Sequence, residues 1–175
     1  MPMKTAKPAT RARPPASSPA RRGASVDLTV QYATRSRTVP DEEHFRTWVC
    51  AALRCNARIT LRVVGMEEGR ALNRRYRSKD YATNVLTFVL DEGPPRAGDL
   101  ALCAPVVSRE ARAQGKDVMA HYAHLTVHGV LHLQGYEHEH ARDALAMEKL
   151  ETRILSRLGF RDPYEPPPSN GRHTQ

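Results

Sequence analysis

The chain has 175 residues, of which 40% are apolar and 26% are charged, a composition typical of one globular domain. No stretch approaches the roughly 20 apolar residues of a membrane-spanning helix, so we do not expect a membrane as a partner. The three cysteines are odd in number and lack the spacing of a zinc finger or redox motif. This argues against a disulfide framework and fits the reducing cytoplasm.

The net charge of +8 is concentrated at the N-terminus. Residues 1–24 contain six lysines or arginines and no acid, whereas the rest of the chain has 21 basic and 19 acidic residues. Five prolines and few large apolar residues predict that residues 1–24 form a disordered basic tail. Two interpretations stay open, a solvated end and an arm that contacts RNA nonspecifically. Residues 161–175 are proline-rich and are also expected to be disordered.

Residues 25–160 are expected to form the one folded domain. Alternating apolar and polar residues predict a strand at 26–32, and Pro40-Asp41 followed by two acids predicts the start of a helix. The other predicted elements are strands at 57–64, 84–90 and 99–103, and helices at about 66–76, 105–114, 117–134 and 140–158. This order of elements predicts an α+β or α/β sandwich with one small mixed sheet.

Three histidines and a glycine mark the most informative segment, which reads HGVLHLQGYEH from His128 to His138. His128 and His132 are four residues apart and share one face of the predicted helix. Gly135 can end that helix and turn the chain back, so that His138 reaches the same ion. Three imidazoles suit zinc, and also nickel, copper or iron. A fourth coordination position left for water is typical of a catalytic site.

The same histidine spacing occurs in metzincin proteases, which carry a glutamate general base directly after the first histidine. That position holds Gly129 in this chain, so peptide hydrolysis by that mechanism is not expected. His124 lies on the same helical side as His128 and His132 and is a candidate for orienting a ligand.

A second segment, residues 72–88, reads LNRRYRSKDYATNVLTF. Its cations and tyrosines suit a loop that contacts phosphates and stacks on bases. The candidate RNA-binding residues are Arg74, Arg75, Tyr76 and Lys79. An arginine here could stabilise the charge on a reacting phosphate beside the metal. The composition alone is equally consistent with a solvated charged loop.

With both segments in view, the chain resembles the YbeY family of bacterial endoribonucleases, over about residues 26–160. The family patterns look like HGxLHLxGYDH and LNxxYRxKDxPTNVLSF, and Gly98-Asp99 is similar to the start of a family strand. The chain departs from these patterns at Ala82, Thr87 and Glu137. Glu137 keeps the charge of the family's aspartate on a longer arm and is a second candidate for orienting a ligand.

The resemblance implies a zincin-like α/β sandwich, an α+β fold in which a small mixed four-stranded sheet packs with about five helices. It implies one zinc ion bound by His128, His132 and His138, and a functional arginine at Arg77. The implied activity is cleavage of single-stranded RNA in ribosomal RNA (16S 3′ end) maturation and ribosome quality control. The implied location is cytoplasmic. The implied partners are ribosomal RNA, the ribosome or a small-subunit ribosomal protein, and an assembly GTPase, but not DNA.

The nucleophile stays open at this point, between a water activated by the metal and the 2′-hydroxyl of the RNA. Two other functions are alternatives. One is a zinc-bearing RNA- or ribosome-binding factor without catalysis. The other is a different zinc hydrolase, of which a protease is disfavoured by Gly129.

Overall fold

The computed structural model describes residues 23–168, so nearly all of the predicted basic tail lies outside the described residues. The strands are β1 (Val26–Ala33), β2 (Ala57–Val64), β3 (Val85–Asp91) and β4 (Arg96–Cys103). The helices are α1 (Glu42–Ala52), α2 (Met66–Arg77), α3 (Ala104–Ala113), α4 (Val118–Leu133) and α5 (Ala141–Arg157). The predicted α+β class, with a four-stranded sheet and five helices, is confirmed. None of the described helices is long and apolar enough to cross a membrane.

The sheet is mixed, as predicted, with the strand order β1-β2-β4-β3. Strands β1, β2 and β4 are parallel, and β3 runs antiparallel to β4 along one edge. Strand β4 begins at Arg96, three residues before the predicted start at Asp99. The prediction was wrong because Arg96 and Ala97 pair with Ala57 and Arg58 of β2, and this long-range pairing leaves no local sequence signal.

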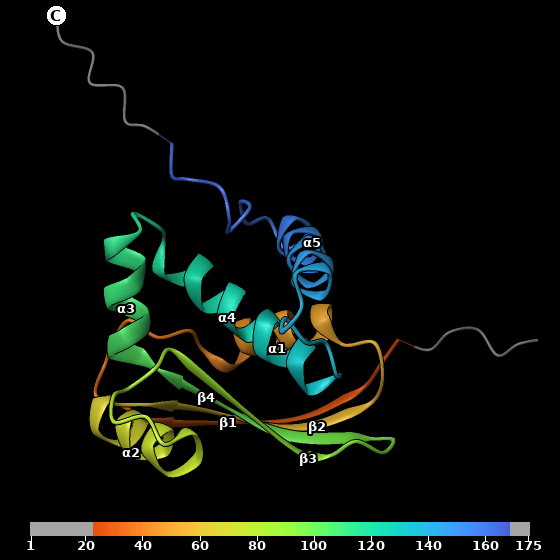
Figure 1. The fold of residues 1–175 in the computed structure, drawn as a ribbon, viewed down its shortest axis with the longest axis horizontal. Coiled ribbons are helices and arrows are strands. Elements are labelled where there is room, and N and C mark those ends of the chain that lie inside the picture. Colours follow the sequence, from red (N-terminus) through yellow and green to blue (C-terminus); the bar gives the residue numbers. More distant parts are fainter. Residues whose placement is uncertain (1–22, 169–175) are drawn as a thin grey trace, which may run out of the picture.

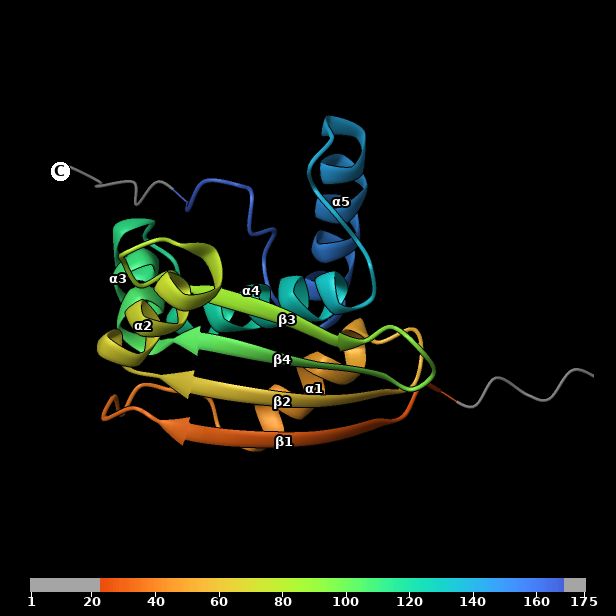
Figure 2. The ribbon, with the colours of Figure 1, turned by 60° about the horizontal axis from the view of Figure 1, so that its bottom comes forward.

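Helices cover the two faces of the sheet unequally. Helices α1 and α4 pack on one face, α5 packs against α4, and α2 lies on the other side of the sheet (Figure 1). Figure 2 shows the strands side by side, with β3 and β1 at the two edges. The core between the sheet and the helices is mostly apolar, and its largest buried side chains include Phe45, Leu61, Leu100, Tyr122 and Leu131. Helix α4 is therefore held on several sides.

The ends of α4 are set by the residues that the sequence indicated. The Asp117 carboxylate caps the first turn by accepting a hydrogen bond from the Ala120 amide at 3.0 Å. At the other end, Gly135 has a φ of 88°, and the Tyr136 amide donates to the Leu131 carbonyl at 3.2 Å. A left-handed residue at this point reverses the chain. The reversal carries residues 136–138 back toward the last turns of the helix.

Two glycines allow α4 to lie close to the sheet. A Cβ at Gly129 would lie 2.3 Å from Cδ2 of Leu100, a buried side chain of β4. A Cβ at Gly98 would lie 2.2 Å from Cδ2 of Leu133 and 2.6 Å from the Phe88 carbonyl oxygen. The backbone of α4 therefore approaches β3 and β4 where it carries the histidines.

Residues 161–168 belong to the end that the sequence predicts to be disordered. They have no regular secondary structure, but they make hydrogen bonds to Lys116 and to α5. The Lys116 ammonium donates to the Pro163 carbonyl at 2.5 Å. Asp162 accepts hydrogen bonds from the Thr152 hydroxyl at 3.2 Å and from the Tyr164 amide at 2.9 Å. Proline-rich composition argues against a helix or strand, but it does not prevent side chains from packing.

We predict that Gly98→Ala destabilises the fold by about 1–3 kcal/mol, because the added methyl group overpacks the β4–α4 contact and meets a backbone carbonyl that cannot rotate away. Urea denaturation measures the change. Gly23→Ala is the matched control, since nothing lies within 4 Å of its added Cβ. Equal stability of the two variants would show that the close approach of α4 to the sheet is not tightly constrained.

Candidate metal centre

The structure brings the three predicted histidine ligands together. One ligand nitrogen from each of His128, His132 and His138 lies within 4.8 Å of the others. The Nε2 atoms of His128 and His132 are 3.1 Å apart, and the rings of His128 and His138 stack at 5.7 Å between centroids. His128 and His132 are half-buried and His138 is exposed, so the cluster opens to solvent on one side.

A buried carboxylate orients one member of the cluster. Glu151 of α5 has an exposed fraction of 0%, and its Oε1 lies 2.5 Å from Nδ1 of His128. Its Oε2 lies 3.2 Å from Nε2 of His124 and also accepts a hydrogen bond from the Tyr164 hydroxyl. Burial alone raises the pKa of Glu151, but the hydrogen bonds from His124, His128 and Tyr164 outweigh it and hold that pKa at about 2.

The charge of Glu151 decides which nitrogen of His128 is available. An ionised carboxylate only accepts hydrogen bonds, so Nδ1 of His128 carries the proton. In the neutral form of this ring, the lone pair is on Nε2, which faces His132. Metal-ligating histidines typically donate their other N–H to a carboxylate in this way.

The protonation state of His132 also suits ligation. Burial lowers its pKa, and the neighbouring His128 and His138 lower it further. A histidine must be neutral to bind a metal, and a lowered pKa keeps it neutral at physiological pH. His128 and His138 line a cavity of about 220 Å³. Together with His132 they form a set of three imidazoles that fits a nitrogen-ligated transition metal with room for a further ligand.

The other two residues predicted to orient a ligand differ in their contacts. His124 hydrogen-bonds Glu151, so it supports the carboxylate and does not contact a ligand nitrogen directly. Glu137 is 64% exposed, and its Oε2 lies 4.0 Å from Nδ1 of His132, a loose contact. Glu151 was missed from the sequence. The available signal was a charged residue on the apolar stripe of α5 that contains Met147, Leu150 and Ile154.

The predicted RNA-binding residues lie on α2 and just after it. Arg74, Arg75, Tyr76 and Arg77 are exposed in the last turn of α2, and Lys79 follows Ser78, whose φ is 56°. The helix predicted at about 66–76 is confirmed, and the expected loop begins only at Ser78. Cations at a helix C-terminus are favoured by the helix dipole. Within residues 23–168, no hydrogen bond or ion pair joins these side chains to the three histidines.

These four cations also form no ion pair with any described acid, whereas Arg70 and Arg62 pair with Asp80 and Glu68. The Tyr76 ring packs edge-on against Phe88 at 4.9 Å, and the Arg75 guanidinium lies 5.3 Å from the centre of the Tyr76 ring. Tyr76 and Phe88 line a groove of about 460 Å³ on the sheet face that α2 partly covers. The aromatic rings of the groove therefore lie next to positive charges that form no ion pair within the described residues.

Fold and site together define an α+β domain with a candidate three-histidine metal centre. A family profile described as Endoribonuclease YbeY matches residues 30–159. The Endoribonuclease YbeY of Nitrosomonas eutropha is 58% identical over 137 residues, which cover 78% of this chain and 97% of that protein. The Endoribonuclease YbeY of Nitrosospira multiformis is 55% identical over 156 residues, with 81% and 82% covered. The chain belongs to the YbeY family, which confirms the resemblance seen in its sequence.

A solved structure supports the fold independently. The solution structure of TM1509 from Thermotoga maritima matches with a TM-score of 0.50 and 21% sequence identity. The match covers 79% of this chain and 99% of that one. At this level of identity the similarity concerns the arrangement of strands and helices alone.

We predict that Glu151→Gln weakens binding of a divalent transition metal by about 10–100-fold, because the amide no longer fixes the tautomer of His128 as a carboxylate does. Competition with a chromophoric chelator measures the affinity. Glu110→Gln is the matched control, since Glu110 hydrogen-bonds His121, which is not one of the three histidines of the cluster. Equal metal affinities of the two variants would show that Glu151 does not contribute to metal binding.

Proposed function

We propose that this protein is a zinc-dependent endoribonuclease that cleaves single-stranded RNA. The observation that carries the proposal is the three-histidine cluster with one imidazole oriented by a buried carboxylate, in a chain whose relatives are named Endoribonuclease YbeY. Zinc is the ion of choice because three neutral imidazoles and an open position are its usual catalytic ligand set.

The three histidines would hold the ion, and Glu151 would keep the proton of His128 on Nδ1. When bound, zinc supplies a Lewis acid that polarises a phosphoryl oxygen and lowers the pKa of a water. Gly129 supplies no general base, and its contact with Leu100 leaves no room for a larger side chain. The nucleophile is therefore either a water or the 2′-hydroxyl of the RNA. A 2′,3′-cyclic phosphate on the product would indicate the 2′-hydroxyl.

We assign RNA binding to the end of α2 and the adjacent groove. Arg77 would bind phosphate oxygens and stabilise charge in the transition state, and Arg74, Arg75 and Lys79 would bind neighbouring phosphates. Tyr76 and Phe88 offer edges and faces on which a base can stack. These contacts need unpaired bases, which favours single-stranded RNA over a duplex.

Edge strand β3 lies between this groove and the helix that carries His128 and His132. The Phe88 side chain lines the groove, whereas the preceding Thr87 faces α4, with its Oγ1 3.4 Å from the position of a Cβ at Gly129. Successive side chains of a strand point to opposite faces. We expect an RNA strand that passes around the β3 edge to contact both regions.

The cellular role in this proposal is ribosomal RNA (16S 3′ end) maturation and ribosome quality control in the cytoplasm. The proposed partners are the ribosome or a small-subunit ribosomal protein, and an assembly GTPase. Family membership supports this role. An RNA-binding factor without catalysis is the competing function, and it would bind RNA without zinc-dependent cleavage.

The activity is tested with purified protein and a labelled single-stranded RNA. We expect cleavage by the wild type, none by His132→Ala because the ion is lost, and a rate about a hundredfold lower for Arg77→Ala because one charge-stabilising group is removed. Arg153→Ala, an exposed arginine on α5, is the control and should cleave like the wild type. If zinc is present and all four preparations cleave equally, a contaminating nuclease is responsible and the proposal fails.

The groove is tested by binding, without cleavage. We predict that Tyr76→Leu weakens binding of a 2′-O-methyl oligoribonucleotide about tenfold, because one stacking surface is lost. Fluorescence anisotropy measures the change. Tyr81→Leu is a matched control, since Tyr76 is 55% exposed and Tyr81 59% but only Tyr76 lines the groove. Similar affinities for the two variants would place RNA binding elsewhere on the protein.

A further inference from the structure

We propose that Tyr164 is a positioning residue of the metal centre, which acts on His128 through Glu151. The inference rests on the zinc site proposed above. Tyr164 lies beyond residues 30–159, the part of the chain that the family profile matches. Its role is therefore assigned from this structure alone.

The contacts of Glu151 carry the argument. The carboxylate is fully buried, so protein groups must supply its hydrogen bonds. His128 donates to one oxygen at 2.5 Å, and His124 and the Tyr164 hydroxyl share the other. Tyr164 is the only one of these three donors that comes from outside α4. Without its hydroxyl, Oε2 keeps only the longer bond from His124, at 3.2 Å.

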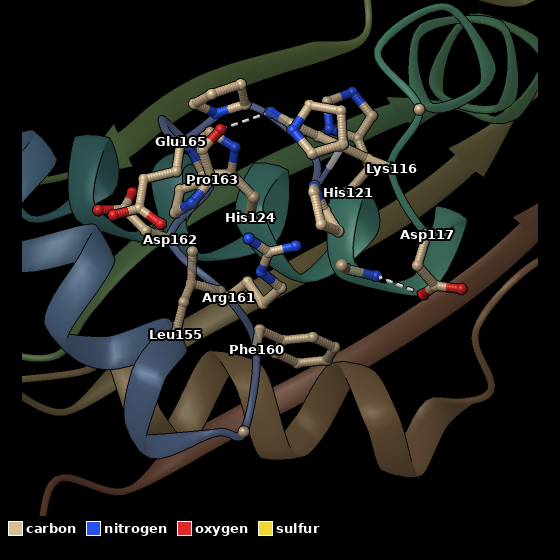
Figure 3. A pocket seen from close by; sticks show the side chains of 16 residues that line it. Lys116, Asp117, His121, His124, Leu155, Phe160, Arg161, Asp162, Pro163 and Glu165 are labelled. Carbon is tan, nitrogen blue, oxygen red and sulfur yellow. Dashed lines mark hydrogen bonds between the residues drawn. The ribbon is translucent and has the colours of Figure 1, made fainter. Parts of the chain in front are cut away.

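The hydroxyl is presented by an anchored segment. Lys116 binds the Pro163 carbonyl just before Tyr164, and Asp162 binds the Tyr164 amide and the Thr152 side chain. Figure 3 shows this segment running past His124, with the bond from Lys116 drawn as a dashed line. The Tyr164 ring also packs edge-on against the His124 ring at 5.4 Å. These contacts therefore hold the Tyr164 side chain in place without a bound ion.

Tyr164 also forms part of the wall of the site. It lines the cavity of about 220 Å³ together with His128, His138 and Glu151. Loss of the hydroxyl would leave Glu151 free to turn toward water or toward His124 and away from Nδ1 of His128. The Nε2 lone pair of His128 would then be less well directed toward the ion.

The test compares Tyr164→Phe with the wild type. We expect its zinc dissociation constant, measured by chelator competition, to rise about tenfold, within the range found when groups that orient a ligand are removed. The visible spectrum of the cobalt(II)-substituted protein should also shift, because the geometry of His128 changes. Thermal unfolding of the metal-free protein should occur at a somewhat lower temperature, because a hydrogen bond to a buried carboxylate is lost while the ring remains. Tyr81→Phe makes the same substitution at an exposed tyrosine and should leave all three measurements unchanged.

Wild-type zinc affinity and an unchanged cobalt spectrum in Tyr164→Phe would overturn the inference. A loss of affinity with an unchanged cobalt spectrum would overturn it too, because the role would then be structural. The histidine site itself is checked separately. If the wild type binds no more zinc than His132→Ala, the zinc site fails and the inference fails with it. If only the Tyr164→Phe arm fails, the proposed nuclease stands.

Discussion

The buried charge of Glu151 is the constraint on which the rest of the candidate centre depends. An ionised carboxylate removed from water is costly by several kcal/mol unless hydrogen bonds replace its hydration. Those bonds come from His124 and His128 of α4 and from Tyr164 in the C-terminal segment. The same carboxylate therefore ties together α4, α5 and residues 161–168, and it fixes the direction in which His128 presents its lone pair. One carboxylate therefore stabilises the packing of these three segments and also orients the His128 ring.

The sheet contributes rigidity to this arrangement and no ligands. Helix α4 packs closely on β3 and β4 because Gly98 and Gly129 have no side chain at the contact. The distance between the sheet and the helical turns that carry His128 and His132 is therefore constrained. The apolar residues of α4 face the core, and His128 and His132 face α5 and the returning chain. The division of the helix into these two sides explains why the segment is mostly buried and yet reaches solvent at His138.

The sequence was informative where the determining contacts are local. Asp117, Gly135 and the four-residue histidine spacing act within one helix and one turn, and the structure has each of them as predicted. Glu151 and Tyr164 join the site through contacts 23 and 13 residues apart along the chain, which no local pattern encodes. The early start of β4 was missed for the same reason, since it depends on pairing with β2. The position of Arg77 relative to the histidines also depends on tertiary packing, and its role stays a prediction.

The order of these parts along the chain has a consequence for synthesis. The four strands are all present once Cys103 has been made, whereas the groups of the candidate centre lie between His124 and Tyr164. Chains emerge from their N-terminus during translation. A nascent chain can thus pair its strands well before it holds a complete centre, and an activity that needs this centre would stay latent until the chain up to Tyr164 has left the ribosome.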